Sequence, residues 1–373
     1  RPPRSTLFPY TTLFRSNIGY WGDHQVVYLL KFLEISVNHH PGELQQLLSR
    51  ELFTYANVPY RIKPYSELLD DPHNTILFDD TLEAIIKTRV ETIGSDGRLV
   101  WDKNEQVVFV NLAEKLLVTL LSKLSNFIPG AGVWMNTQRP EWNDANNALV
   151  GYGVSMVTTY YLRAFIGFCR ELFGSSKEAL RLTEEVATFF TRMKKAMDLQ
   201  ADQVEDMLTR RGMKTCMDLF GEAGSDFRQL IYREGFSGKH SEVGVNQFLE
   251  FFDDALRVLD QSILSNRRDD RLYHAYNLIN VDGDQLVLRR LYEMLEGQVA
   301  VLSSGYLKIE EAIDLLDALK SSKLFREDQY SYILYPDRIL PSFMDINNIP
   351  ADKLNRSELL KRLLQRNDRR ILV

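Results

Sequence analysis

Two short segments concentrate side chains that could act on a sugar. Each has a tryptophan, a carboxylate and amide groups immediately before a helical pattern. An aromatic face packs on the apolar face of a pyranose ring, while carboxylates and amides bind its hydroxyls with directional hydrogen bonds. We therefore interpret both segments as parts of one sugar site. The candidate binding residues are Trp21, Asp23, His24, Gln25, Arg139, Glu141, Trp142, Asn143 and Asn147.

Asp144, in the second segment, is the candidate for proton transfer. Burial beside Trp142 would raise the pKa of this carboxyl group, because burial disfavours its charged form, and the group could then act as a general acid. A structural alternative stays open for both segments. Asp23 and Asp144 can be N-caps or first-turn acids favoured by the helix dipole, and the tryptophans can be core anchors. The density of amides weighs against it, since each buried amide without a partner costs about 1–3 kcal/mol.

Two histidines rank lower as candidates. His240 and His274 lie in polar loops where they could contact a substrate or a phosphate, although a structural histidine is the commoner situation for each. Arg139 could likewise hold phosphate or sugar, or form a surface ion pair. Asp282-Gly283-Asp284 lacks the ligand spacing of a calcium loop and predicts a turn before a helix. We predict no metal site and no organic cofactor.

The composition excludes several classes of partner. The 373 residues include 45 Lys and Arg against 51 Asp and Glu, a net charge of -6, which gives no electrostatic reason to approach nucleic acid or an anionic membrane. The most apolar stretch, 154–169, is shorter than the ~20 residues of a membrane span and contains Arg163. Cys169 and Cys216 have no disulfide or zinc spacing. We expect an ordinary globular protein in the cytoplasm.

Helical periodicity dominates the chain, and strand patterns are few and short. Unusually long connections at 54–79, 94–103, 127–143 and 236–245 are expected to carry function. Helical hairpins with long loops at one end predict an all-α fold, an (α/α)6 toroid-like barrel incomplete at its N-terminus. Predicted helices cover 22–37, 42–51, 81–91, 112–126, 146–173, 176–199, 201–210, 214–232, 247–265, 285–301, 309–321 and 356–366.

The predicted domain organisation has three parts. Residues 1–16 lack an initial Met, and Pro9, Thr11 and Thr12 interrupt any signal-peptide pattern. This string resembles the conceptual translation of a sequencing adapter, so we exclude it and expect the native N-terminus to lie outside this chain. Residues 17–325 are predicted to form the partial catalytic toroid. Residues 326–373 are predicted to form a C-terminal extension.

The second segment carries a family resemblance. Trp142-Asn143-Asp144 resembles the D-W-N-D-x-x-N segment of the cellobiose and chitobiose phosphorylases, glycoside hydrolase family 94, in the six-hairpin glycosidase group. Trp21-Gly22-Asp23-His24-Gln25 is similar to the S-D-D-H-L-W segment of that family. The resemblance implies an (α/α)6 toroid that cleaves a β-glucosidic bond by inverting phosphorolysis. It also implies that Asp144 is the general acid and that Asp23 binds hydroxyls of the non-reducing sugar.

The departures from that family leave the nucleophile open. Glu141 stands where the family has Asp, Gly22 replaces an acid and Gln25 replaces Leu. No phosphate-binding residues of the family map onto this chain. We therefore expect either a glycoside phosphorylase, with inorganic phosphate as co-substrate, or an inverting hydrolase. In a hydrolase a second carboxylate activates water, and Asp23 and Glu141 are the candidates.

Two further interpretations remain. In the first, the same residues bind an oligosaccharide or glucoside in a non-catalytic helical module. In the second, the protein is a lyase acting on uronates, which requires a basic cleft with a Tyr or His base. The net negative charge and the Trp-carboxylate segments count against the lyase.

Overall fold

The computed structural model describes residues 23–136, 149–176, 178–201, 204–337, 341–354 and 356–366. The chain divides into two compact units, Arg1–Leu334 and Tyr335–Val373. The second unit contains three short helices, α16 (Phe343–Ile346), α17 (Ala351–Leu354) and α18 (Glu358–Gln365). The predicted boundary after residue 325 is not tested by this division and stays a prediction.

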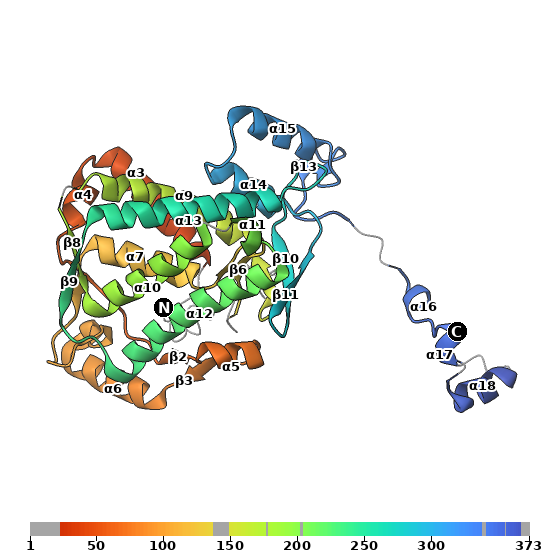
Figure 1. Ribbon diagram of the computed structural model, residues 1–373, viewed down its shortest axis with the longest axis horizontal. Helices are drawn as coiled ribbons and strands as arrows, with labels where there is room; N and C mark the ends of the chain where they lie inside the picture. The colour runs from red at the N-terminus through yellow and green to blue at the C-terminus, as the bar shows by residue number, and fades with distance from the viewer. Residues whose placement is uncertain are drawn as a thin grey trace, which may run out of the picture. The chain divides into compact units, whose positions relative to one another are not determined.

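Five long helices lie side by side and form the main core of the first unit (Figure 1). Three of them, α9, α10 and α13, meet through almost completely buried phenylalanines, with ring contacts among Phe173, Phe190, Phe248, Phe251 and Phe252. The buried faces repeat at helical spacing, which is the pattern that predicted these helices. The five are α7 (Leu112–Leu124), α9 (Met156–Gly174), α10 (Glu184–Ala201), α12 (Arg210–Glu234) and α13 (Val245–Ser265).

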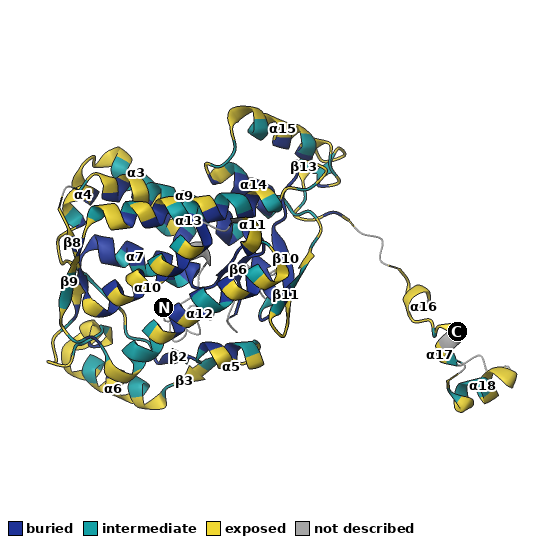
Figure 2. Ribbon diagram, viewed as in Figure 1, coloured by how far each residue is buried: buried dark blue, intermediate teal, exposed yellow. Residues whose placement is uncertain are grey.

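The remaining elements of the first unit lie around these five helices, and α3 (Asp23–His39) adds Val26, Leu30 and Leu33 to the main core. Figure 2 shows that their outer faces are mostly exposed. The helices are α3 (Asp23–His39), α4 (Glu43–Leu47), α5 (Tyr65–Asp70), α6 (Asp80–Ile93), the 3-10 helix η1 (Gly94–Arg98), α11 (Val204–Met207), α14 (Leu295–Ser303) and α15 (Ile309–Lys320). Two-stranded antiparallel pairs join β1 (Phe53–Thr54) to β4 (Phe109–Val110), β2 (Tyr60–Ile62) to β3 (Ile76–Phe78), β8 (Leu180–Thr183) to β9 (His240–Val243), and β12 (Phe325–Arg326) to β13 (Ser331–Tyr332).

A five-stranded antiparallel sheet corrects the predicted all-α toroid. Of the residues that the structure describes, 56% are helical and 15% are in strands, so the fold is mixed rather than all-α. The strand order is β11-β10-β7-β6-β5. Apolar residues of the sheet pack against Met213 and Met217 of α12. The strands are β5 (Phe127–Ile128), β6 (Gly132–Trp134), β7 (Gly153–Ser155), β10 (Tyr276–Asp282) and β11 (Gln285–Arg290).

The sheet was missed because parts of its strands were assigned to helices. The predicted helix over 285–301 begins instead with β11, which pairs with β10 over six residue pairs from Asn277↔Arg290 to Asp282↔Gln285. Gly283, with φ 59°, forms the hairpin turn between them, so the predicted turn precedes a strand and not a helix. The predicted helix over 146–173 also begins too early, because β7 precedes α9 and Ser155 caps that helix by accepting from the Thr158 N–H.

Two buried asparagines fasten the sheet to the end of α13. The side-chain amide of Asn266 donates to the carbonyls of Gly130 and Ser262 at 2.8 Å. Asn277 donates to the Asn266 Oδ1 at 3.0 Å and to the Ala131 carbonyl at 2.8 Å. Both asparagines are fully buried. Their bonds satisfy backbone carbonyls between β5 and β6 that water cannot reach.

We expect Asn266→Ala to lower the free energy of unfolding by about 1–3 kcal/mol, because buried polar groups would lose their partners. Chemical denaturation followed by circular dichroism measures this change. Asn38→Ala on exposed α3 is the matched control, and its effect should stay within about 0.5 kcal/mol. Equal effects of the two substitutions would contradict this role of Asn266.

Candidate functional site

Most residues of the predicted sugar site lie outside the described part of the chain. Asp23, His24 and Gln25 open α3, but only their backbone is described. Their predicted roles, and those of the remaining residues, stay predictions. The residues outside the description are Trp21, Arg139, Glu141, Trp142, Asn143, Asp144 and Asn147.

The two ends of the segment that carries Asp144 are held together in the sheet. This segment, 137–148, connects β6 to β7. The Gly151 N–H donates to the Met135 carbonyl at 2.7 Å, and the Trp134 indole N–H donates to the Gly151 carbonyl at 2.9 Å. On the other side, the Asn136 amide donates to the Asn126 Oδ1 at 2.7 Å, with both side chains buried. The attachment points of the segment are therefore fixed by hydrogen bonds.

His73 lies next to Gly151 and Tyr152, at the C-terminal end of this segment, and was not predicted from the sequence. Its ring contacts Tyr152 edge-on, with the centroids 5.9 Å apart. Gly151 has φ 92°, and a Cβ there would lie 2.7 Å from the His73 Cε1. Glycine is required at this position both by the left-handed backbone and by the close imidazole. The sequence interpretation placed Gly151 inside a helix, which the structure corrects.

His274, a lower-ranked candidate, is buried beneath the sheet. Its Nδ1 lies 2.8 Å from the Leu291 carbonyl oxygen, and its own carbonyl accepts from the Tyr160 hydroxyl at 2.8 Å. Burial, and then the nearby Arg268 guanidinium, lower the pKa of His274 to about 4. The imidazole is therefore neutral at neutral pH, and these contacts are those of a structural histidine.

His240, the other lower-ranked candidate, lies on β9 at the surface. Its Nδ1 is 3.0 Å from the Arg181 Nη2, and Arg181 also pairs with Glu51 at 2.8 Å. An open polar hollow of about 530 Å³ surrounds this pair. Its lining mixes positive and negative side chains, so no single charge dominates it. The lining residues are Arg181, Glu184, Gly238, Lys239, His240, Ser241 and Glu242.

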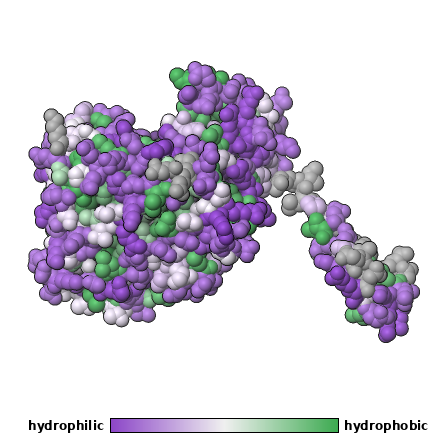
Figure 3. Space-filling model, in the orientation of Figure 1, coloured by the Kyte–Doolittle hydropathy of each residue, from purple (hydrophilic) through white to green (hydrophobic). Residues whose placement is uncertain are grey.

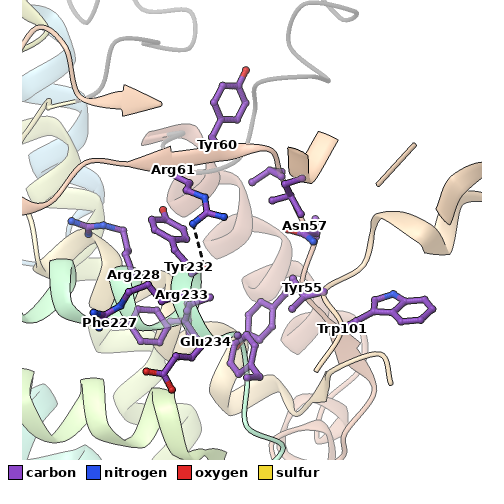
Figure 4. A pocket seen from close by; sticks show the side chains of 18 residues that line it. Tyr55, Asn57, Tyr60, Arg61, Trp101, Phe227, Arg228, Tyr232, Arg233 and Glu234 are labelled. Carbon is purple, nitrogen blue, oxygen red and sulfur yellow. Dashed lines mark hydrogen bonds between the residues drawn. The ribbon is translucent and has the colours of Figure 1, made fainter. Parts of the chain in front are cut away.

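A second cavity, of about 470 Å³, is the best candidate for a ligand site among the described residues (Figure 4). It lies between the segment after β1, α6, α7 and the C-terminal part of α12. Three of the four connections expected to carry function contribute to it. Six aromatic residues line it, namely Tyr55, Tyr60, Trp101, Phe227, Tyr232 and Phe236. The other lining residues are Ala56, Asn57, Val58, Arg61, Leu82, Val100, Val118, Arg228, Ile231, Arg233, Glu234 and Gly235.

Tyr55 is fixed on every side. Its ring stacks on Phe236 with the centroids 5.5 Å apart and an interplanar angle of 6°. The Lys115 ammonium lies 4.3 Å from the Tyr55 ring centroid and donates to the Thr54 carbonyl at 2.9 Å. The Tyr55 hydroxyl donates to the Glu114 Oε1 at 2.9 Å. Tyr55 is thus a rigid part of the cavity wall.

Glu114 is the buried carboxylate behind that wall. It accepts from the Thr183 N–H at 2.6 Å and from the Thr183 hydroxyl at 2.9 Å, in addition to Tyr55. Burial raises the pKa of Glu114, while these hydrogen bonds oppose the rise. Burial also raises the pKa of the Tyr55 hydroxyl well above its ordinary value, and the Glu114 charge adds to the shift. Glu114 and the Tyr55 hydroxyl are therefore joined by a hydrogen bond behind the wall of the cavity, and Glu114 itself does not line it.

Arg61 occupies the centre of the cavity view, next to Tyr232 (Figure 4). Its Nε donates to the Asp79 Oδ2 at 2.6 Å, and its Nη1 donates to the Tyr232 carbonyl at 3.1 Å. Asp79 also caps α6 by accepting from the Leu82 N–H, the main cause of its lowered pKa. A guanidinium has five N–H donors. Three of these donors are used by the bonds to Asp79 and Tyr232 and by the 2.5 Å contact between the Arg61 Nη2 and Asp79. The other two are suited to ligand oxygens.

The charge of the cavity suits binding better than acid–base chemistry. Glu234 is the only carboxylate among the described residues that line it, and its Oε2 lies 3.7 Å from the Lys103 Nζ. Glycosidic cleavage with water requires two carboxyl groups. The described lining therefore offers hydrogen-bonding and apolar groups but not the pair of carboxyl groups that such a reaction requires.

Helix α12 connects the cavity wall to Asn136, the last described residue before the segment 137–148. Arg228 lines the cavity, and Gly224, one turn earlier on α12, lies against Ser125. Ser125 is followed by Asn126, which holds Asn136 at the end of β6. The close contact at Gly224 leaves no room for a side chain, because a Cβ there would lie 2.5 Å from the Ser125 Cβ.

The described residues hold no cluster of three or more His, Cys, Asp or Glu side chains placed to bind a metal ion. Among the described helices, none is long and apolar enough to cross a bilayer. Comparisons with known protein families and with curated proteins find no match for this chain. The resemblance to the cellobiose and chitobiose phosphorylases stays a prediction from the two short segments.

We expect the stability of the protein to depend on pH through His274. An unfolded histidine has a pKa near 6.5, so the folded state loses stability as the pH falls from about 6.5 towards 4 and the ring must be protonated. The lowered pKa corresponds to at most about 3 kcal/mol. Urea unfolding of the protein and of His274→Asn across this range measures the effect.

The difference in unfolding free energy between the protein and His274→Asn should shrink as the pH falls. His39→Asn, at the exposed end of α3, is the control for the loss of an imidazole elsewhere in the protein. An unaltered pH slope in His274→Asn would show that the imidazole is not held neutral.

Proposed function

We propose that this chain belongs to a carbohydrate-active enzyme that cleaves a glucosidic bond with inversion. Asp144 is the general acid, and inorganic phosphate or water is the nucleophile. The aromatic cavity that contains Arg61 and Asn57 is the observation that carries the proposal. The Trp142-Asn143-Asp144 segment supports it from the sequence.

The cavity has the size and chemistry that a sugar requires. Its volume of about 470 Å³ lies within the range of ordinary ligand pockets, ~300–1,000 Å³. The aromatic side chains give the cavity an apolar wall that would exclude water from a pyranose ring, while Asn57 and Arg61 offer hydrogen bonds to hydroxyls. We propose an oligosaccharide or glucoside as the substrate and the cytoplasm as the compartment. No nucleic acid takes part in this proposal.

The proposed reaction needs one proton donor and one nucleophile. The Asp144 carboxyl group gives its proton to the glycosidic oxygen as the bond to the anomeric carbon breaks. Phosphate or water attacks the anomeric carbon from the opposite face, so its configuration inverts. Phosphate brings its own negative charge, whereas water has to give a proton to a second carboxylate, for which Asp23 and Glu141 are the candidates.

We expect Asp144→Asn to abolish cleavage of β-linked glucobioses, because an amide cannot donate the proton. Loss of general acid catalysis lowers the rate by about 10²–10⁴-fold. Free glucose and glucose 1-phosphate are measured with and without inorganic phosphate. Phosphate-dependent glucose 1-phosphate identifies a phosphorylase, and phosphate-independent glucose identifies a hydrolase. Unchanged turnover by Asp144→Asn would refute the role of Asp144.

We expect Asn57→Ala to weaken binding of the same glucobioses about three- to tenfold, which is the contribution of one hydrogen bond. Isothermal titration calorimetry measures the affinity. Asn38→Ala, an equivalent substitution on exposed α3, should leave the affinity unchanged. If both variants bind as the protein does, the cavity is not the sugar site.

A non-catalytic sugar-binding module is the second candidate function. The single carboxylate in the described cavity lining, which lies near Lys103, favours it. This alternative predicts binding that depends on Asn57 without any release of glucose or glucose 1-phosphate. The two assays therefore separate an enzyme from a binding module.

A further inference from the structure

The helix α15 presents two apolar faces, of which only one packs in the protein. Leu315 and Leu319 are buried against α9 and α14 residues in a satellite core. Ile309, Ile313 and Leu316 are 76%, 55% and 49% exposed. At 100° per residue, these three side chains lie within about 60° of one another on the helix surface. They form a continuous apolar stripe that faces solvent, and Figure 2 shows the outer side of α15 as exposed.

A row of acids runs along one side of this stripe. Glu310, Asp314 and Asp317 are exposed and follow the apolar residues at helical spacing. Asp314 has one distant cationic neighbour, Arg271, at 3.8 Å. Two α15 helices packed together would bring these acids close to one another, and like charges oppose such a pairing. The chemistry of the surface instead fits an amphipathic helix with basic flanks.

The chain itself contains a helix with these properties. α18 carries four leucines on one face, of which Leu359 is 67% and Leu364 is 39% exposed, and none of its residues is buried. Lys361, Arg362 and Arg366 lie on the flanks of this leucine face at helical spacing. The sequence of α18 therefore complements α15 both in its apolar face and in its charge. Figure 3 shows that most of the surface in that view is hydrophilic. Exposed apolar patches on such a surface often mark sites of interaction with a protein.

We propose that α15 is a docking surface for α18 of a second copy of this chain. Two copies that exchange this helix make the same contact twice, which closes a symmetric dimer. The leucines of α18 cover Ile309, Ile313 and Leu316, and its basic side chains face the acidic row. The apolar contacts supply the affinity, and the charges select the partner and its orientation.

Sedimentation equilibrium of the full chain over a range of concentrations tests the proposal. We expect a concentration-dependent dimer that weakens as salt is added. Ile313→Asp and Leu363→Asp should each raise the dissociation constant about tenfold or more, because each places a charge in the apolar contact. Leu264→Asp, at a 50% exposed position on α13, is the matched control and should leave the dimer unchanged.

Charge reversal identifies the pairing of the two helices. Asp314→Lys with Asp317→Lys should weaken the dimer, and so should Lys361→Glu with Arg362→Glu. In an equimolar mixture the mixed dimer has one unaltered contact and one in which both charges are reversed, so it should form more tightly than the dimer of either variant alone. A monomer at every concentration would overturn the proposal, and so would a dimer insensitive to these changes. Hydrogen exchange of a monomer gives the third outcome. If the substitutions in α15 change the exchange protection of α18 in a monomer, α18 binds its own chain and the proposal is overturned.

Discussion

The buried carboxylate of Glu114 is the interaction on which the candidate cavity most depends. A carboxylate removed from water loses its hydration, and this cost is recovered only if protein donors replace the lost hydrogen bonds. Glu114 finds three such donors, two from Thr183 and one from Tyr55. It therefore ties α7 both to β8 and to the segment that lines the cavity. Lys115, the next residue, adds the contact with the face of Tyr55. A single turn of α7 thus fixes the position of Tyr55 in the cavity wall.

The long helices could be predicted from the sequence because their apolar residues repeat at one period. α7, α12, α13 and α15 correspond to predicted segments for this reason. The five-stranded sheet could not be found in the same way. β5, β6 and β7 are only two or three residues long and are buried on both faces, so they show no alternation. β11 has three consecutive apolar residues followed by two arginines, so it does not alternate either, and together with the apolar residues of α14 it was assigned to one helix. The all-α prediction was wrong at these elements.

The candidate site was predictable only as a set of connections. The segments 54–79, 94–103 and 236–245 were expected to carry function because they are long, and each contributes residues to the cavity. The individual side chains were not predicted, because Tyr55, Arg61, Trp101 and Tyr232 come from elements distant in sequence that meet through the Glu114 and Asp79 hydrogen bonds. His73 was missed for the same reason, since only the fold brings it to Gly151. The motif that contains Asp144 predicts a type of reaction from the sequence, but its residues lie outside the described part of the chain.

Binding and cleavage of a sugar, as proposed for this protein, place different demands on it. In the proposal, the aromatic lining and the guanidinium fixed by Asp79 would bind a polyhydroxylated ring without any change in protonation. Cleavage also requires a carboxyl group that keeps its proton near neutral pH, which in turn requires an apolar and dry environment. A carboxyl group in such an environment loses the hydrogen bonds of water, so the surrounding protein has to replace them. The hydrogen bonds of Trp134, Asn136 and Gly151 fix the described ends of the connection that carries Asp144 in the sequence. The sheet, rather than the end of a helix as in the expected toroid, therefore provides the attachment points of this connection.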